Sequence, residues 1–128
     1  MEFGWELADP TAMSMTRSAY QAFIADSKCD LGIAKHAYVA SRSGWFSDRS
    51  LCYLAMGRPV LHQDTGYPNW LPATEGVLPF TDTEDLLRGL CEIDRNLAVH
   101  SKAAREVAEA HFEAREVLST LLTEVDVL

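Results

Sequence analysis

The order of apolar and polar positions predicts short buried strands that alternate with helices. Three short apolar runs are typical of strands covered on both faces, because their apolar residues are consecutive and do not alternate with polar ones. These runs are residues 31–40, a strand with its exit loop, residues 60–62 and residues 76–80. Polar, turn-forming stretches follow each of the first two runs.

Helical signals lie between and after these runs. Asp9-Pro10 predicts an N-cap and first helical position, and apolar residues on one face extend that helix to about Asp26. Ser47 is placed to cap a helix over residues 48–56, which Gly57 would end in the left-handed conformation. A further helix is expected to start at "EDLL", capped by Thr81 or Thr83.

The C-terminal third of the chain predicts helices alone. Apolar residues recur every three or four positions from Leu86 to Leu97, and residues 101–110 are rich in alanine. The last amphipathic helix carries a stripe of five apolar residues, Val117, Leu118, Leu121, Leu122 and Val125.

This order predicts an α/β fold: a partial Rossmann-like domain with about three short parallel strands, flanking helices and a helical C-terminus. We expect residues 1–128 to form a single domain, since 128 residues with 48% hydrophobic composition can bury one core. A parallel sheet of about three strands needs cover on both faces and both edges. The sequence therefore also predicts assembly with another chain or with a second copy.

The net charge and the cysteine content of the chain limit the kinds of partner and binding site that we expect. The formal net charge is -8, which argues against a nucleic-acid backbone or an anionic membrane as the main partner. No apolar run is long enough to span a bilayer and the N-terminus does not resemble a signal peptide, so a cytoplasmic location is expected. The three cysteines and four histidines show no metal-ligand spacing, so no metal and no cofactor are expected.

The stretch "SGWFSDRS" is the first candidate site. A helix N-terminus favours anions, because its N–H groups lack intrahelical partners and its dipole is positive at that end. Serine hydroxyls and one arginine would add donors for a phosphate. The candidate diphosphate-binding residues are Ser43, Gly44, Ser47, Asp48, Arg49 and Ser50.

A purely structural explanation of the same stretch stays open. Ser47 would then be an ordinary helix cap, and Phe46 would pack against Leu51 as a hydrophobic staple. Asp48 suits the helix dipole but not a neighbouring phosphate, and would sit better against an arginine or a ribose hydroxyl.

The stretch "QDTGYPNW" follows the second strand and is the second candidate site. Ligands of open parallel sheets bind outside the carboxyl ends of the strands, so Asp64, Thr65 and Gly66 are candidates for sugar hydroxyls. Lys35 and His36, expected at the end of the first strand, are candidates for a phosphate contact. Plain surface turns and a solvated charge pair are the alternatives. No motif identifies a catalytic residue.

The central stretch "AKHAYVASRSGWFSDRSLCYLAMGRPVLHQDTG" resembles the donor-binding part of bacterial GT-B glycosyltransferases, and "AAREVAEAHFEAREVLSTLL" resembles their closing helices. The resemblance implies that the loop at Ser43 and the helix start at Ser47 face the diphosphate of a nucleotide-sugar. Gly44 and Cys52 stand where the family commonly has two glutamates.

The resemblance also implies that the acceptor pocket and the catalytic base lie in another half of such enzymes. We therefore expect a donor domain that binds a nucleotide-sugar and does not transfer sugar alone, with a partner chain supplying the rest. The alternative is a non-enzymatic scaffold module that self-associates through an exposed sheet edge.

Overall fold

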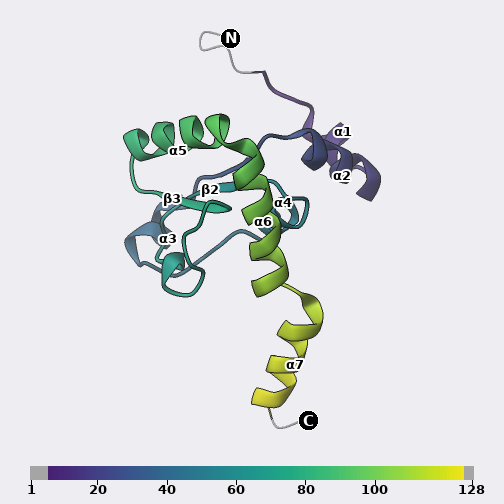
Figure 1. Ribbon diagram of the computed structural model, residues 1–128, viewed down its shortest axis with the longest axis vertical. Coiled ribbons are helices and arrows are strands. Elements are labelled where there is room, and N and C mark those ends of the chain that lie inside the picture. Colours follow the sequence, from purple (N-terminus) through teal and green to yellow (C-terminus); the bar gives the residue numbers. More distant parts are fainter. Residues whose placement is uncertain (1–5, 126–128) are drawn as a thin grey trace.

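The computed structural model describes residues 6–125 and confirms a mixed α/β fold with three parallel strands in one sheet (Figure 1). The strand order is β1-β2-β3, so each strand pairs with its neighbour in sequence. Leu61 of β2 lies opposite Leu31 of β1 and Leu78 of β3. The strands are β1 (Asp30–Gly32), β2 (Val60–Gln63) and β3 (Val77–Phe80).

Helices cover both faces of the sheet. On one face, α5 packs Ile93 against Leu61 and Phe80. On the other face, α4 and α6 join Val60 in a larger apolar cluster. The helices are α1 (Pro10–Ser14), α2 (Arg17–Asp26), α3 (His36–Ala40), α4 (Asp48–Ala55), α5 (Thr83–Arg95), α6 (Leu97–His111) and α7 (Ala114–Glu124), with a 3-10 turn, η1 (Tyr67–Asn69).

The first predicted strand is shorter than expected. It ends at Gly32, and the residues from His36 onward form α3. The pairing partner explains the difference, because β2 is only four residues long and its register with β1 ends at His62. Beyond that point the Gln63 side chain accepts a hydrogen bond from the Ala34 N–H, in place of a further sheet bond. Lys35 and His36 therefore lie at the start of a short helix and not at a strand end.

Two helix boundaries also differ from the expectation. The first helix is divided into α1 and α2, because the Thr16 side chain caps a new helix by accepting a bond from the Ala19 N–H. The N-cap of α5 is Asp82, which accepts a bond from the Asp85 N–H, and neither Thr81 nor Thr83 occupies that position.

Other local signals are confirmed. The Asp9 side chain caps α1 by accepting a bond from the Thr11 N–H, with Pro10 at the first helical position. Gly57 has a φ of 66° after α4, in the left-handed region where glycine carries no steric cost. The expected strands at residues 60–62 and 76–80 correspond to β2 and β3.

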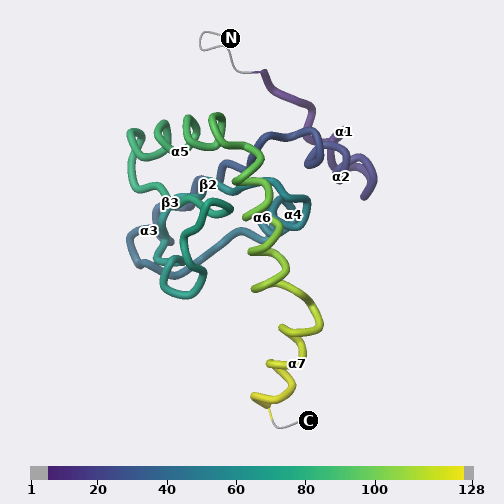
Figure 2. Tube along the Cα trace, viewed as in Figure 1, coloured from purple at the N-terminus to yellow at the C-terminus, as the bar shows by residue number. Residues whose placement is uncertain are grey.

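The C-terminal helix α7 extends away from the sheet and its covering helices (Figure 2). None of its residues is buried. No helix among residues 6–125 is both long enough and apolar enough to cross a membrane.

Candidate functional site

Two polar loops lie side by side near the carboxyl end of β2. The first loop (residues 41–47) connects α3 to α4, and the second (residues 64–70) follows β2. The Gly44 N–H donates to the Thr65 carbonyl over 2.8 Å, and the Thr65 hydroxyl donates to the Trp45 carbonyl over 2.5 Å. The Trp70 indole N–H donates to the Gly44 carbonyl over 2.8 Å. The two candidate stretches are thus joined into one unit, which we call the loop pair.

The loop pair depends on two glycines with positive φ. Gly44 has a φ of 75° and Gly66 a φ of 92°, both in the region that side-chain-bearing residues avoid. A Cβ atom on Gly66 would also lie 3.0 Å from the Arg42 carbonyl oxygen of the first loop. Gly66 therefore permits the close approach of the two backbones, while Gly44 supplies the left-handed conformation that the first loop needs.

Asp64 orients the start of the second loop. Its Oδ1 accepts a bond of 2.7 Å from the Gly66 N–H, an Asx-turn arrangement. Its backbone N–H donates to the Phe80 carbonyl at the end of β3. Its Oδ2 lies 3.7 Å from a side-chain nitrogen of Arg42. Asp64 of the second loop therefore forms a long ion pair with Arg42 of the first loop.

Two of the candidate residues at the N-terminus of α4 bind the sheet, and two do not. Ser47 is buried but makes no side-chain cap bond, and Asp48 accepts from the Arg49 N–H. Arg49 and Ser50 turn instead toward the sheet, where both bind the buried Asp30 of β1. In this arrangement Ser50 is fully buried, while the Arg49 side chain remains 47% exposed.

The remaining candidate residues are exposed. Lys35 is the N-cap residue of α3 and His36 its first residue, and both side chains face solvent. Ser43 is exposed in the first loop, and its hydroxyl accepts from the Trp45 N–H over 3.3 Å.

An aromatic cluster lies beneath the loop pair. Phe46, which was expected to pack against Leu51, packs among aromatic rings: its ring centroid is 5.0 Å from Tyr67, 5.1 Å from His62 and 6.4 Å from Phe112. The cluster joins the first loop to the second loop and to α6. Its members are Tyr38, Trp45, Phe46, His62, Tyr67, Trp70 and Phe112.

Two polar atoms in this cluster are buried without a hydrogen-bond partner, the His62 Nε2 and the Tyr67 hydroxyl. Burial lowers the pKa of His62 and raises that of Tyr67, and the nearby Asp64 carboxylate adds to the second effect. Buried polar groups are normally paired, so these two atoms are exceptions in the core, and both residues are fully buried. Sequence reasoning missed His62, whose only signal was a histidine within an otherwise apolar strand.

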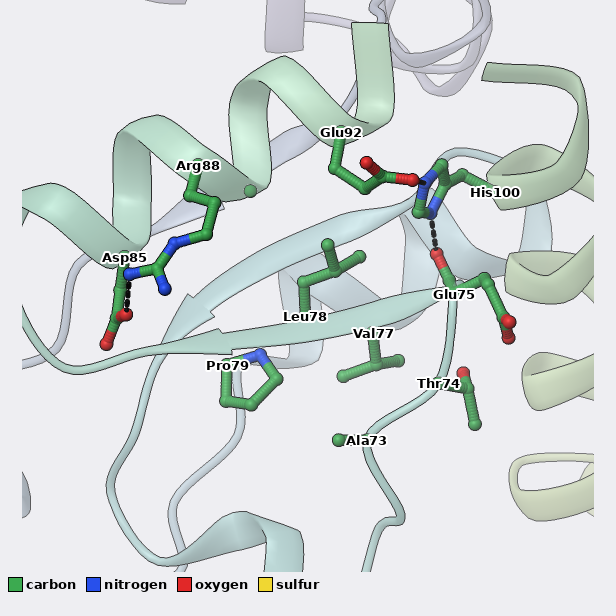
Figure 3. Close-up of a pocket in the computed structure, with 11 residues that line it drawn as sticks. Ala73, Thr74, Glu75, Val77, Leu78, Pro79, Asp85, Arg88, Glu92 and His100 are labelled. Carbon is green, nitrogen blue, oxygen red and sulfur yellow. Dashed lines mark hydrogen bonds and ion pairs between the residues drawn. The ribbon is translucent and has the colours of Figure 1, made fainter. Parts of the chain in front are cut away.

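A separate cleft of about 600 Å³ runs along the outer edge of β3 (Figure 3). Side chains from α5 and α6 face it, with Leu78 and Pro79 of β3 at its base. Several of its polar groups have partners within the protein: Arg88 donates to Asp85, the His100 Nδ1 contacts the Glu75 carbonyl, and the Glu92 carboxylate accepts from Asn96. No pattern in the sequence indicated this cleft.

Within residues 6–125 no group of three or more histidine, cysteine, aspartate or glutamate residues is arranged to hold a metal ion.

Comparison with protein-family models, curated proteins and solved structures found no match to this chain. The likeness to GT-B glycosyltransferases therefore stays a prediction from the residues quoted above.

Proposed function

We propose that this chain is a donor-binding module of GT-B type, which binds a nucleotide-diphosphate sugar and is not catalytic alone. The observation that carries the proposal is the loop pair: two glycine-bearing loops, bonded to each other, beside the carboxyl end of β2 in a parallel sheet. This is where open α/β sheets bind their ligands.

The diphosphate would lie at the N-terminus of α4. The Ser47 side chain does not cap this helix, so first-turn N–H groups other than that of Arg49 have no side-chain partner, and an anion could accept from them. Arg42 and Lys35 would offset the overall charge of -8 locally, while Arg49, which is paired with Asp30, would act indirectly. Ser50 would act indirectly, by holding Asp30 and with it the position of the helix start.

The sugar or ribose hydroxyls would meet the second loop. Asp64 offers the Oδ2 that faces Arg42, a geometry suited to accepting from a hydroxyl group. Thr65 is buried and already donates to Trp45, so its role would be to hold the loop pair together. Gly66 would act indirectly, by letting the second loop lie against the Arg42 backbone of the first loop.

In this proposal the module stabilises the departing diphosphate by the α4 N-terminus and the neighbouring cations, which is electrostatic leaving-group stabilisation. No bound metal is required for that role. The acceptor pocket and the base would come from a second domain or a partner chain.

Titration with UDP, TDP and GDP, followed by calorimetry and by backbone amide NMR, tests the proposal. We expect shifts confined to the loop pair and the start of α4, and an affinity that falls about tenfold or more on Arg42→Ala, since a charge-assisted bond is worth about 1.5–3 kcal/mol. Lys102→Ala, which removes an exposed cation from α6, is the matched control and should bind as wild type. Absence of any shift at millimolar ligand would overturn the proposal.

A scaffold module that self-associates through a sheet edge is the second candidate function. The observation in its favour is β1, which pairs only with β2 among the described strands and is followed by Ile33, 71% exposed. Arg49 opposes it, because a guanidinium N–H donates to the outward Leu31 carbonyl over 3.4 Å and so occupies part of that edge. Loss of self-association in Ile33→Lys would support this candidate.

A further inference from the structure

The cleft along the outer edge of β3 is separate from the loop pair, and none of its lining residues belongs to either loop. Its volume of about 600 Å³ falls within the range of about 300–1,000 Å³ that is typical of small-molecule sites. Leu78 and Pro79 form its apolar base, and polar side chains of α5 and α6 stand beside that base (Figure 3). An apolar surface with a few polar groups is the usual composition of a ligand site.

His100 is the buried polar side chain of this cleft. It is only 3% exposed, and its Nδ1 contacts the Glu75 carbonyl. A carbonyl oxygen can only accept a hydrogen bond, so Nδ1 carries the proton and Nε2 of the neutral ring is an acceptor. Nε2 lies 3.8 Å from a carboxylate oxygen of Glu92, which is beyond hydrogen-bond distance. Within residues 6–125 this buried acceptor therefore has no donor.

The Glu92 carboxylate has no cationic partner in the part of the chain that the structure describes. Its hydrogen-bond donor is the uncharged amide of Asn96, and Arg88, the cation that lines the cleft, is paired with Asp85. Two acceptors, the His100 Nε2 and the Glu92 carboxylate, thus lie next to each other (Figure 3). Acceptors 3.8 Å apart can both bond to one ammonium nitrogen at about 2.8–3.0 Å.

From this geometry we propose that the cleft binds a small primary amine in its ammonium form. The ammonium group lies between His100 and Glu92 and donates to both, and the apolar body of the ligand covers Leu78 and Pro79. The ammonium group supplies the donor that the buried Nε2 lacks and the positive charge that Glu92 lacks.

The edge of β3 favours a small molecule over an extended peptide. The Val77 N–H and carbonyl both pair with Thr74, and Pro79 has no N–H to offer. A peptide strand would therefore find no regular ladder of backbone hydrogen bonds along this edge. Side chains alone remain to hold a ligand here.

NMR titration with phenethylamine tests the proposal, at about pH 8, where an ordinary histidine is neutral and an alkylamine is charged. Phenethyl alcohol is the uncharged probe of the same shape. We expect Nε2 to be the unprotonated nitrogen of His100 and its ¹⁵N signal to move on addition of the amine. Amide shifts should gather on β3, α5 and the start of α6, and the loop pair should not respond. Phenethyl alcohol should bind at least about fivefold more weakly, since it lacks the charge.

Glu92→Gln removes the charge and keeps the shape of the side chain, so the affinity for phenethylamine should fall at least about threefold. Glu84→Gln is the matched control, because Glu84 is an exposed carboxylate of the same helix that does not line the cleft. It should bind as wild type.

Three results would overturn the proposal. Equal weakening in the two variants would mean that the amine responds only to the overall charge of -8. A proton on Nε2 before the amine is added would mean that His100 is itself the cation beside Glu92. Absence of shifts in the cleft at about 20 mM phenethylamine would exclude a site, since even a weak ligand of this size should bind at that concentration.

Discussion

The buried carboxylate of Asp30 at the start of β1 is held by Ser50 of α4. The Ser50 hydroxyl donates to Oδ2 over 2.6 Å, and the Arg49 Nε donates to Oδ1 over 3.0 Å. Asp30 is only 5% exposed, so these bonds replace the water that the carboxylate gives up on folding. The "DRS" segment at the start of α4 therefore fastens that helix to the sheet, directly below the loop pair.

Ser50→Ala should lower the free energy of unfolding by about 1.5–3 kcal/mol, the range for a buried bond to a charged group. Chemical denaturation with urea would measure it. Ser41→Ala is the control, because its hydroxyl is exposed and bonds only to the Ala37 carbonyl one turn earlier. That variant should change stability by less than about 0.5 kcal/mol. Equal effects of the two substitutions would contradict the role assigned to Ser50.

Gly76 precedes β3 where the strand meets the backbone of α6. A Cβ atom at this position would lie 2.5 Å from the Ala104 nitrogen, so Gly76→Ala would force β3 and α6 apart. Overpacking of this kind costs about 1–3 kcal/mol or more. We expect a clear fall in melting temperature in a thermal unfolding experiment.

Gly89→Ala is the control for Gly76→Ala. Its added Cβ would meet the end of the Leu61 side chain at 2.7 Å, which can rotate aside, and alanine gains about 1 kcal/mol of helix propensity over glycine. Gly76→Ala should therefore be the more destabilising of the two. The opposite order would mean that α6 can shift more easily than the Leu61 side chain.

His62 should make stability depend on pH. Burial, the largest cause, lowers its pKa in the folded protein, while its bond to the Gln63 carbonyl and the Asp30 charge raise it in part and the Arg49 charge lowers it. The unfolded chain then binds a proton below about pH 6.5 that the folded chain does not. Stability should therefore fall as the pH decreases through about 6.5, until the folded-state pKa is reached.

Urea denaturation of wild type and His62→Gln between about pH 7 and 5 measures this dependence. The variant should lose the part of the pH slope that one histidine contributes. His111→Gln removes an exposed histidine from the end of α6 and serves as the control. If the slope falls as much in His111→Gln as in His62→Gln, the prediction is wrong.

The sequence predicted the parts of this fold that depend on local physics. Asp9 and Gly57 act through bonds and dihedral angles within a few residues, and the strands at residues 60–62 and 76–80 follow from consecutive apolar positions. The end of β1 was mispredicted because the length of its neighbour β2 sets it. The hydrogen bond from Ser50 to Asp30 could not be predicted either, since Asp30 lies twenty residues earlier in the chain.

The same limit applies to the candidate site. Two loops at the carboxyl ends of β1 and β2 were expected to share one edge, and the Gly44–Thr65 bond joins them. The sequence could not indicate the aromatic cluster below them, because it is assembled from β2, both loops and α6. The unpaired Nε2 of His62 becomes apparent only when these elements are packed together in the fold.

Tyr67→Phe separates a structural role of the Tyr67 hydroxyl from a role in ligand binding. The hydroxyl is buried and has no hydrogen-bond partner, so its removal should leave stability unchanged or raise it by about 1 kcal/mol. Thr65→Val is the contrast. It removes a buried hydroxyl that does have a partner, the Trp45 carbonyl, and should cost about 1–2 kcal/mol.

If the hydroxyl of Tyr67 serves a ligand, the same Tyr67→Phe variant should bind UDP more weakly than wild type while being at least as stable. Calorimetric titration and urea denaturation on one preparation would show both effects. A variant destabilised by more than about 1 kcal/mol would mean that the hydroxyl has a structural partner. Unchanged UDP affinity in a stable variant would exclude the hydroxyl from the ligand site, and would leave His62 as the buried polar group to test next.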